Sequence, residues 1–346
     1  MEHIVITGGL GFIGVNTAIR FMEKGKQVVL IDNMGRKGTK TNYEHLCANY
    51  KGKFSFERTD IRDFKRLSRI FRKYSAIRAV FHFAAQVAVT TSVLDPREDF
   101  ESNALGTFNV LECIRLYAPA APIIFSSTNK VYGGFENVRI VEKDGRYAYA
   151  DFPQGISEDT NLDFHSPYGC SKGAADQYIH DYNRIYNVKS IVYRQSCIYG
   201  IHQFGIEDQG WVAWFTIASV LGKPITIYGN GRQARDVLFI DDLTRLYEQS
   251  LDCMDTLNGG IYNIGGGAEN VMSLLELVAF LEKFLEKKIP YKTEDWRPGD
   301  QKVYISNIAK IKKDIGWEPL INVEKGVEIL YKWIIKNRDM LLKALK

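Results

Sequence analysis

The stretch Gly8-Gly9-Leu10-Gly11-Phe12-Ile13-Gly14 decides the fold of this chain. It follows a short apolar run at 3–7, which predicts a buried strand, and it opens a helical pattern that continues to about Lys24. A second apolar run at 28–31 then ends in Asp32. These glycines stand between a predicted strand and a predicted helix, and the next predicted strand ends in an acidic residue. This combination predicts a strand–helix–strand unit that binds a dinucleotide.

Each part of this unit has a physical task. The first glycines permit the tight turn, Gly11 lets the backbone approach a pyrophosphate, and Gly14 lets the helix pack closely on the strand. The helix N-terminus offers unpaired amides and the positive end of its dipole to the phosphates. Asp32 would accept hydrogen bonds from the ribose and repel a 2′-phosphate. We therefore expect NAD rather than NADP, although Arg36 and Lys37 lie close enough to weaken that preference.

The remaining chain extends this unit. Apolar runs separated by helical patterns predict further strands at 54–58, 79–83, 122–126 and 190–194. The alternation indicates an α/β fold with a Rossmann-type, doubly wound parallel sheet covered by helices on both faces. We expect residues 1–195 to form the NAD-binding domain, with later segments around 232–262 returning to it. Residues 196–346 then form mainly a smaller α/β domain that binds the substrate.

Three helices and one loop are predicted in more detail. Ser273-Leu274-Leu275-Glu276 has the pattern of a capping box, and Ser306 precedes a short helix that Gly316 ends. A final amphipathic helix spans about 323–345. The polar segment 134–165 is predicted to be a long loop, and a loop of that length is more often functional than passive.

Composition limits the possible partners. The chain of 346 residues has 45 Lys and Arg against 41 Asp and Glu, giving a net charge of +4 with both signs interspersed. We therefore expect no nucleic-acid partner. Five cysteines without paired spacing favour a reducing cytoplasm, and six scattered histidines suggest no metal site. The glycine loop follows Met1 so closely that we expect no signal peptide, and no apolar run is long enough for a membrane span.

A phenol and an ammonium mark the expected chemistry. Tyr168 and Lys172 are one helical turn apart, so both side chains lie on one helix face. A nearby cation stabilises a phenolate and lowers the pKa of a tyrosine, which makes Tyr168 a plausible acid and base near neutral pH. Thr128, in the Ser-rich segment 126–133, could align a substrate hydroxyl or carbonyl.

Other strand ends fit a cofactor site. Asp60-Ile61 follows one strand, where the amide of Ile61 could meet an adenine, and Phe83-Ala84-Ala85-Gln86 ends another with the small residues that close packing requires. Asn103 lies in a helical run, where a buried amide needs partners. A structural amide and a cofactor ligand are equally good interpretations of Asn103.

Together these residues resemble the extended short-chain dehydrogenase/reductases, and the match extends almost end to end through 229–236 and 297–300. The resemblance implies a nucleotide-activated sugar as substrate, NAD held throughout the cycle, and catalysis by Thr128, Tyr168 and Lys172. The implied cofactor contacts are Gly8, Gly11, Phe12, Ile13, Asp32, Asn33, Arg36, Asp60, Ile61, Ala84, Ala85, Gln86, Asn103, Ser126, Tyr168, Lys172 and Arg194. The expected substrate contacts are Val87, Thr90, Thr128, Asn129, Lys130, His165, Gln209, Arg235 and Arg297, the last two on the diphosphate.

The residues after Thr128 separate the reactions of this family. Its 4,6-dehydratases carry Asp-Glu there, because eliminating water needs an acid and a base, whereas this chain has Asn129-Lys130. An amide and a cation cannot replace that pair, which disfavours dehydration. An epimerase, a decarboxylating enzyme and a ketoreductase remain possible, and a non-catalytic NAD sensor would have no reason to keep Thr128, Tyr168 and Lys172 together.

Segments 126–133, 165–178 and 208–212 resemble the CDP-tyvelose 2-epimerases of this family. Many UDP-sugar 4-epimerases have Asn at the position of Cys197, so the substrate is expected to be held differently. The resemblance implies a CDP-hexose as substrate, with a UDP-sugar 4-epimerase or decarboxylase as the alternative. It also implies a homodimer or tetramer, formed through helices near 97–117 and 166–186.

Overall fold

The computed structural model describes residues 2–74, 76–297 and 300–345. The chain divides into two compact units. The first comprises Met1–Val131, Ser166–Arg194 and Thr244–Tyr262, and the second comprises Tyr132–His165, Gln195–Leu243 and Asn263–Lys346. The sequence-based boundary at residue 195 differs from this division, because segments 132–165 and 232–243 belong to the second unit.

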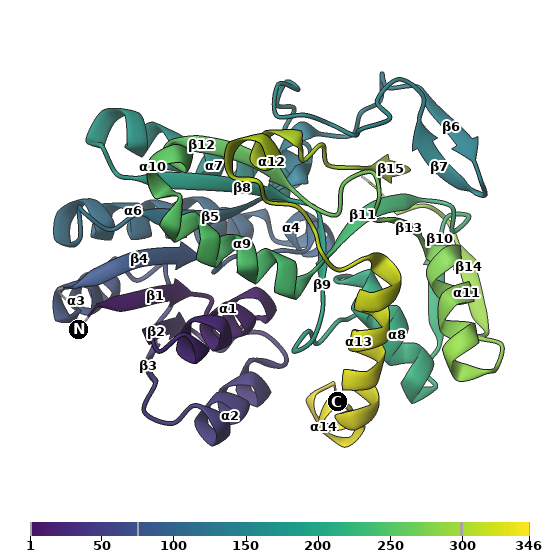
Figure 1. The fold of residues 1–346 in the computed structure, drawn as a ribbon, viewed down its shortest axis with the longest axis horizontal. Coiled ribbons are helices and arrows are strands. Elements are labelled where there is room, and N and C mark those ends of the chain that lie inside the picture. Colours follow the sequence, from purple (N-terminus) through teal and green to yellow (C-terminus); the bar gives the residue numbers. More distant parts are fainter. Residues whose placement is uncertain (1, 75, 298–299, 346) are drawn as a thin grey trace. The chain divides into compact units, whose positions relative to one another are not determined.

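A seven-stranded sheet forms the centre of the first unit, in the order β12-β8-β5-β4-β1-β2-β3 (Figure 1). Every strand predicted from the apolar runs is present. Neighbouring strands from β3 to β5 pair in parallel, which confirms the doubly wound α/β fold. The strand bounds are β1 His3–Thr7, β2 Gln27–Asp32, β3 Phe54–Arg58, β4 Ile77–His82, β5 Ile123–Thr128, β8 Ser190–Gln195 and β12 Gly260–Ile264.

Helices cover both faces of this sheet, as β4 illustrates. Val80 belongs to a buried apolar cluster with residues of α3, α6 and α7. The next residue, Phe81, faces the other layer, where its ring lies 5.1 Å from that of Phe21 on α1 and 5.5 Å from that of Tyr247 on α9. The helices are α1 Phe12–Glu23, α2 Thr39–Asn49, α3 Phe64–Lys73, α4 Val89–Leu94, α5 Pro96–Phe100, the π-helix η1 Glu101–Leu105, α6 Gly106–Tyr117, α7 Ser166–Tyr186, α9 Ile240–Asp252 and α10 Met254–Leu257.

Short strands and helices make up the second unit. β11 is its central strand and pairs with β9, β13 and β15, while β10 pairs with β14. The strands are β6 Ile140–Lys143, β7 Arg146–Tyr149, β9 Cys197–Tyr199, β10 Ile225–Tyr228, β11 Ala234–Phe239, β13 Val271–Ser273, β14 Tyr291–Glu294 and β15 Val303–Tyr304. The helices are α8 Trp211–Leu221, α11 Leu274–Leu285, α12 Ala309–Ile315, α13 Val323–Lys336 and α14 Arg338–Ala344. The short 3-10 helix η2 Asn129–Tyr132 follows β5 and lies at the boundary between the two units along the chain.

Two helix ends of this unit follow the predicted signals. The capping box at Ser273 and Glu276 is present, with both reciprocal hydrogen bonds. Gly316 ends α12 in the left-handed conformation, with φ 69°, that its missing side chain permits. None of the helices in the described ranges combines the length and the apolar character needed to cross a bilayer.

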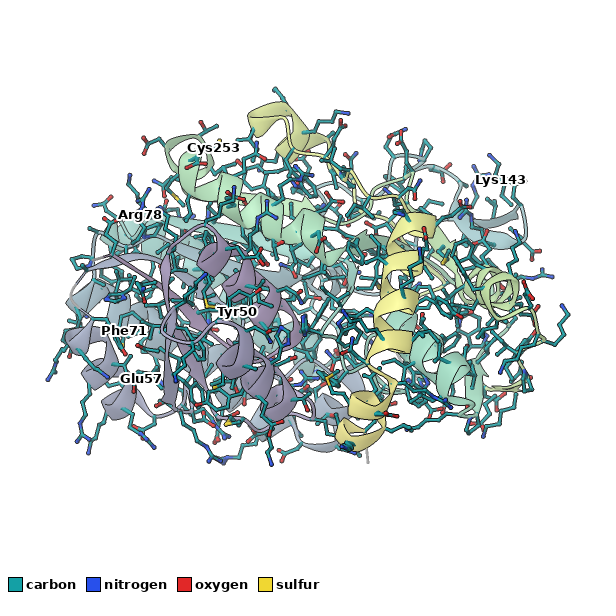
Figure 2. All side chains as sticks on the ribbon, turned by 60° about the horizontal axis from the view of Figure 1, so that its bottom comes forward. Tyr50, Glu57, Phe71, Arg78, Lys143 and Cys253 are labelled. Carbon is teal, nitrogen blue, oxygen red and sulfur yellow. The ribbon has the colours of Figure 1, made fainter. Side chains whose placement is uncertain are left out.

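Two expectations for the second unit were wrong. The segment 134–165 is not loop throughout, because β6 and β7 form an antiparallel hairpin whose turn residues Asp144 and Gly145 both have positive φ. Lys143 lies next to this turn at an exposed edge (Figure 2). The helix expected at 323–345 is two helices, because the Asn337 side chain bonds the Trp333 carbonyl oxygen and the backbone leaves the helical conformation there.

Candidate active site and cofactor cradle

The glycine loop of the first unit is shaped by close backbone contacts. Gly8 has φ +66°, and a Cβ atom there would lie 2.7 Å from the backbone nitrogen of Ala84. A Cβ on Gly14 would lie 2.2 Å from the Gly8 carbonyl oxygen, so only glycine lets α1 approach this closely. A Cβ on Gly11 would meet only that same oxygen, at 3.2 Å. The loop is therefore tight on its protein side and open at Gly11.

The N-terminus of α1 begins directly at this open position. Gly11 is its N-cap residue, and no side chain among the described residues caps the helix. The amides of the first turn, which contains the predicted contacts Phe12 and Ile13, therefore keep their donors for a phosphate group.

Asp32 at the end of β2 supports the loop. Its carboxylate accepts hydrogen bonds from the backbone nitrogens of Leu10, at 3.1 Å, and Met34, at 2.7 Å. Burial raises the pKa of Asp32, and these two backbone hydrogen bonds oppose that shift. The same carboxylate that is predicted to bind the ribose thus also holds the glycine loop to β2.

Residues after β2 and β3 lie together beside this loop. The Asn33 amide donates to Asp60 at 2.9 Å, and Arg62 donates to the same carboxylate, so hydrogen bonds from Arg62 lower the pKa of Asp60 to about 2. The Ile61 carbonyl oxygen accepts a hydrogen bond from Asn109 at 3.0 Å. The predicted adenine-side residues are therefore brought together and held in fixed positions.

The segment after β4 carries Ala84, Ala85 and Gln86. The Gln86 backbone nitrogen donates to the Asn103 side chain at 2.8 Å, and the Asn103 amide donates back to the Gln86 carbonyl oxygen at 3.0 Å. Asn103 therefore acts as a buried structural amide, which was one of its two interpretations. A contact between Asn103 and a cofactor stays a prediction.

The three predicted catalytic residues converge at the C-terminal end of β5. Thr128 ends this strand, Tyr168 lies in the first turn of α7, and Lys172 lies one turn later. The Thr128 hydroxyl acts on the Tyr168 phenol and lowers the pKa of Tyr168 relative to burial alone. The Lys172 ammonium donates to the Ser126 carbonyl oxygen at 2.6 Å and lies 4.1 Å from the Phe125 ring centroid. All three residues are buried and belong to the first unit.

Burial controls the ionisation of this centre. It raises the pKa of Tyr168 to about 12, although the Thr128 hydroxyl and the charge of Arg36 act in the opposite direction. Burial also lowers the pKa of Lys172 to about 7. The expectation that the phenol has a lowered pKa was wrong for the chain itself, because desolvation of Tyr168 outweighs the effects of Thr128 and of the Arg36 charge.

Arg194, a predicted cofactor contact, lies in a buried ion pair. Its guanidinium donates to both oxygens of Asp176, each at 3.0 Å, and the Ser127 hydroxyl donates to the same carboxylate at 2.7 Å. The Arg194 side chain is 4% exposed. This placement favours a structural role, and its cofactor contact stays a prediction.

Two of the predicted sugar contacts of the first unit, Asn129 and Lys130, are hydrogen-bonded to Thr128. Its hydroxyl donates to Asn129 at 3.3 Å and accepts from the Lys130 backbone nitrogen at 3.3 Å. Val87 and Thr90, after β4, are partly buried. The fold therefore brings Asn129 and Lys130 next to a catalytic candidate.

The second unit holds the other predicted substrate contacts. Arg235 on β11 pairs with Asp300 at 2.9 Å and bonds the Gln301 carbonyl oxygen. His165 is exposed, and Gln209 lies in a backbone bridge with Ile206. Residues 298–299 of the predicted 297–300 motif lie outside the described residues.

Arg297 lies against an aromatic ring that the sequence did not single out. Its guanidinium carbon is 3.7 Å from the ring centroid of Tyr228, and its side chain pairs with Asp208 at 3.1 Å. The signal for Tyr228 was its position directly before the 229–236 motif at the end of an apolar run. The first unit contains a second missed residue, the fully buried Asp99, which precedes Asn103 by one helical turn.

Comparisons with known proteins agree with this geometry. A model of the family described as GDP-mannose 4,6 dehydratase matches residues 5–330. The chain is 43% identical over 335 residues to CDP-paratose 2-epimerase of Salmonella typhi, covering 95% of this chain and 98% of the relative. It is 31% identical to UDP-glucuronate 4-epimerase of Thermodesulfobacterium geofontis, covering 100% of both chains. The solved structure of UDP-glucuronic acid 4-epimerase from Bacillus cereus, in complex with UDP-glucuronic acid and NAD, has a TM-score of 0.82 at 27% identity, over 97% of this chain and 99% of that chain.

Proposed function

Because this chain belongs to the extended short-chain dehydrogenase/reductases, in the family described as GDP-mannose 4,6 dehydratase, we propose that it is an NAD-retaining epimerase of a nucleotide-activated deoxysugar. The reaction interconverts CDP-paratose and CDP-tyvelose at sugar C2. The observation that carries this proposal is the convergence of the buried residues Thr128, Tyr168 and Lys172 at the end of β5 and the start of α7. The 43% identity to a CDP-paratose 2-epimerase supports the choice of substrate.

The residues of the first unit fit a dinucleotide. The loop is open at Gly11, α1 begins there without a capping side chain, and Asp32 ends the neighbouring strand. When bound, NAD would accept a hydride from sugar C2 and return it, and its positively charged ring would favour the Tyr168 phenolate.

The chain's own residues handle the proton. The Tyr168 phenolate takes the proton from the C2 hydroxyl, while Thr128 hydrogen-bonds the same oxygen and the Lys172 ammonium stabilises the phenolate. The 2-keto sugar then reorients so that C2 would receive the hydride on its opposite face, and Tyr168 gives the proton back to the oxygen. Because oxidation and reduction cancel, no external reductant is consumed.

Residues outside this centre select the substrate. Asn129 and Lys130 stand where a 4,6-dehydratase would need a carboxyl pair, so dehydration of the sugar is disfavoured. The guanidinium groups of Arg235 and Arg297 suit a diphosphate, because they bind its oxygens bidentately.

The protein is further proposed to form a homodimer or a tetramer. Apolar side chains on the outer faces of the helices at 89–117 and of α7 are exposed, with Leu94 85% and Ile185 62% exposed. Others on the same faces are Val93, Phe100, Leu105, Phe108, Leu116 and Tyr178. A monomer rarely exposes so many large apolar groups together, and a second copy of the chain would cover them. Light scattering coupled to size exclusion would measure the mass.

An assay with three substrates tests the proposed reaction. Purified protein is incubated with CDP-paratose, UDP-glucose or UDP-glucuronate without added cofactor, and the products are identified by NMR. The expected result is CDP-tyvelose from CDP-paratose alone. Conversion of a UDP-sugar at C4 or by loss of CO2 would favour the 4-epimerase or decarboxylase alternative, and turnover only with added NADH would indicate a ketoreductase.

A further inference from the structure

We propose that Asp99 is a positioning residue for the reaction, whose buried carboxylate ties the helix turn bearing Tyr168 and Lys172 to the segment after β4 and supplies a negative charge that acts on Lys172. This inference rests on the proposed function, since it concerns the same catalytic centre. Asp99 lies on α5, is 0% exposed and has no role in the mechanism described above.

The Asp99 carboxylate is bonded by three neutral side chains. One oxygen accepts from the Gln86 amide at 2.9 Å and from the Asn103 amide at 3.2 Å. The other accepts from the Ser171 hydroxyl. Ser171 lies between Tyr168 and Lys172, so the carboxylate is bonded directly to the turn that presents both catalytic side chains.

The donors of Asp99 are also bonded to one another. Asn103 donates to the Ser171 hydroxyl at 3.0 Å, and Gln86 and Asn103 exchange two hydrogen bonds through the Gln86 backbone. Three parts of the first unit therefore meet at one carboxylate: the segment after β4, the helices α5 and η1, and the start of α7. A shift of any one of them would cost hydrogen bonds in a buried site.

Several charged groups face this centre, and two of them are carboxylates that act on Lys172. Asp176, one turn beyond Lys172 on α7, has the larger effect on the Lys172 ammonium, and both of its oxygens accept hydrogen bonds from Arg194 of β8. Among the described residues no guanidinium bonds Asp99, and the cation that acts on it is Lys172. Asp99 is therefore a carboxylate held by neutral side chains that acts on both Lys172 and Tyr168.

The two remaining groups that face the centre come from β4 and from the loop after β2. His82 on β4 is neutral, because burial lowers its pKa to about 3, and its ring nitrogens bond the hydroxyls of Thr7 and Thr107. Arg36, in the loop after β2, contributes a positive charge that acts on Tyr168. Neither group compensates the charge of Asp99.

The charge of Asp99 acts on both catalytic groups in the same direction. Together with Asp176, whose effect is larger, it raises the pKa of Lys172 by stabilising the ammonium, and it raises the pKa of Tyr168 by opposing the phenolate. Burial raises the pKa of Asp99 itself, while the hydrogen bonds from Ser171 and Gln86 and the charge of Lys172 keep it ionisable. Removing the charge should therefore move both ionisations, and with them the pH optimum, to lower pH.

The variant Asp99→Asn tests the charge with little change of shape. We expect kcat for CDP-paratose epimerisation to fall about tenfold or more, because a buried hydrogen bond to a charged group is lost. The pH optimum of kcat should move to lower pH. An unchanged optimum would overturn the proposal, whatever happens to kcat. If Asp99→Asn does not fold, Asp99→Ser makes the same change of charge and leaves room for a water molecule.

Two matched variants separate charge from structure. Ser171→Ala removes the hydrogen bonds that the Ser171 hydroxyl makes with Asp99 and Asn103 and keeps the carboxylate, so kcat should fall while the optimum stays in place. Glu101→Gln removes a half-exposed charge just beyond α5 and should change neither. If Ser171→Ala and Asp99→Asn shift the pH optimum equally, Asp99 acts only by holding neighbouring residues in place and not through its charge.

A spectroscopic measurement makes the test independent of the substrate. The ultraviolet absorbance of tyrosinate is titrated in the purified holoenzyme, with the Tyr168→Phe variant subtracted to isolate Tyr168. The Tyr168 signal should appear at lower pH in Asp99→Asn than in the wild type, and an identical titration would overturn the proposal. If CDP-paratose is not turned over at all, the proposed function fails, while this titration still decides the role of Asp99.

Discussion

The polar side chains of the two units differ in their burial and in their hydrogen-bond and ion-pair partners. In the first unit, Thr128, Tyr168 and Lys172 are buried and bonded within the fold. In the second unit, the Arg235 and Arg297 side chains are 12% and 24% exposed, and each is paired with a carboxylate that is itself partly exposed. A phosphate can compete for a guanidinium whose partner is partly solvated, whereas a buried network cannot rearrange cheaply. This difference fits the proposed function, in which the first unit holds the catalytic centre and the second unit binds an exchangeable ligand.

The largest effect is expected from a variant that removes the Tyr168 hydroxyl, which carries the proton in the proposed reaction. Tyr168→Phe keeps the ring and deletes the hydroxyl, so kcat should fall by about 10²–10⁴-fold because general acid–base catalysis is lost. Binding of the CDP-sugar, measured by calorimetry, should change little, since the arginines belong to the second unit. Near-normal turnover with Lys172 intact would contradict the assignment of Tyr168.

A variant in the second unit should weaken substrate binding and leave the catalytic step largely unchanged. Arg297→Ala removes a charged donor, and KM for CDP-paratose should rise by about 10- to 100-fold with a smaller effect on kcat. Arg232→Ala, which deletes an exposed guanidinium paired with Glu142, is the control and should leave KM unchanged. Should Arg297→Ala lower kcat and leave KM as it is, the division of labour between the units would be wrong.

The glycine loop tests how rigid the first unit is. Gly14→Ala forces a Cβ atom to within 2.2 Å of the Gly8 carbonyl oxygen, so α1 must move away. We expect a loss of about 1–3 kcal/mol in the free energy of unfolding and less NAD in the purified protein. Gly25→Ala is the matched control for cofactor content, since nothing lies within 4 Å of its Cβ position. Equal NAD content in both variants would show that the loop tolerates a side chain.

The smallest effect is expected in the pH dependence of the free energy of unfolding. Because His82 has a pKa of about 3 in the fold and about 6.5 when unfolded, the unfolded state binds the extra proton between these values. The stability that this group provides is complete above pH 6.5 and is lost as the pH falls, by about 1.4 kcal/mol per pH unit. His82→Asn should show a smaller slope in urea unfolding between pH 6.5 and 4.5. An identical slope would mean that His82 titrates normally in the folded protein.

The sequence predicted the first unit better than the second. The glycine loop, Asp32 and the strand ends act locally, and apolar runs were enough to place six of the seven strands of the large sheet, all except β12. The family and the meeting of Thr128, Tyr168 and Lys172 were predicted through the resemblance. Asp99 was missed because its environment comes from residues 86, 103 and 171, which only the tertiary fold brings together.

In the second unit, the features that the sequence predicts correctly are set by residues that lie close together in the chain. The capping box at Ser273 and the stop at Gly316 were read correctly, because each acts within one helix turn. The turn signal at Asp144-Gly145 would have indicated the hairpin, and it was overlooked within a polar segment. The contact between Arg297 and Tyr228 joins two separate strand ends, so no spacing along the chain indicates it.

The central claim, a hydride removed from and returned to one sugar carbon, is tested most directly by an isotope at that carbon. CDP-paratose carrying deuterium at C2 is incubated with the purified protein without added cofactor, and the product is examined by NMR and mass spectrometry. We predict CDP-tyvelose that retains deuterium at C2. Product in which solvent hydrogen has replaced the deuterium would contradict the claim.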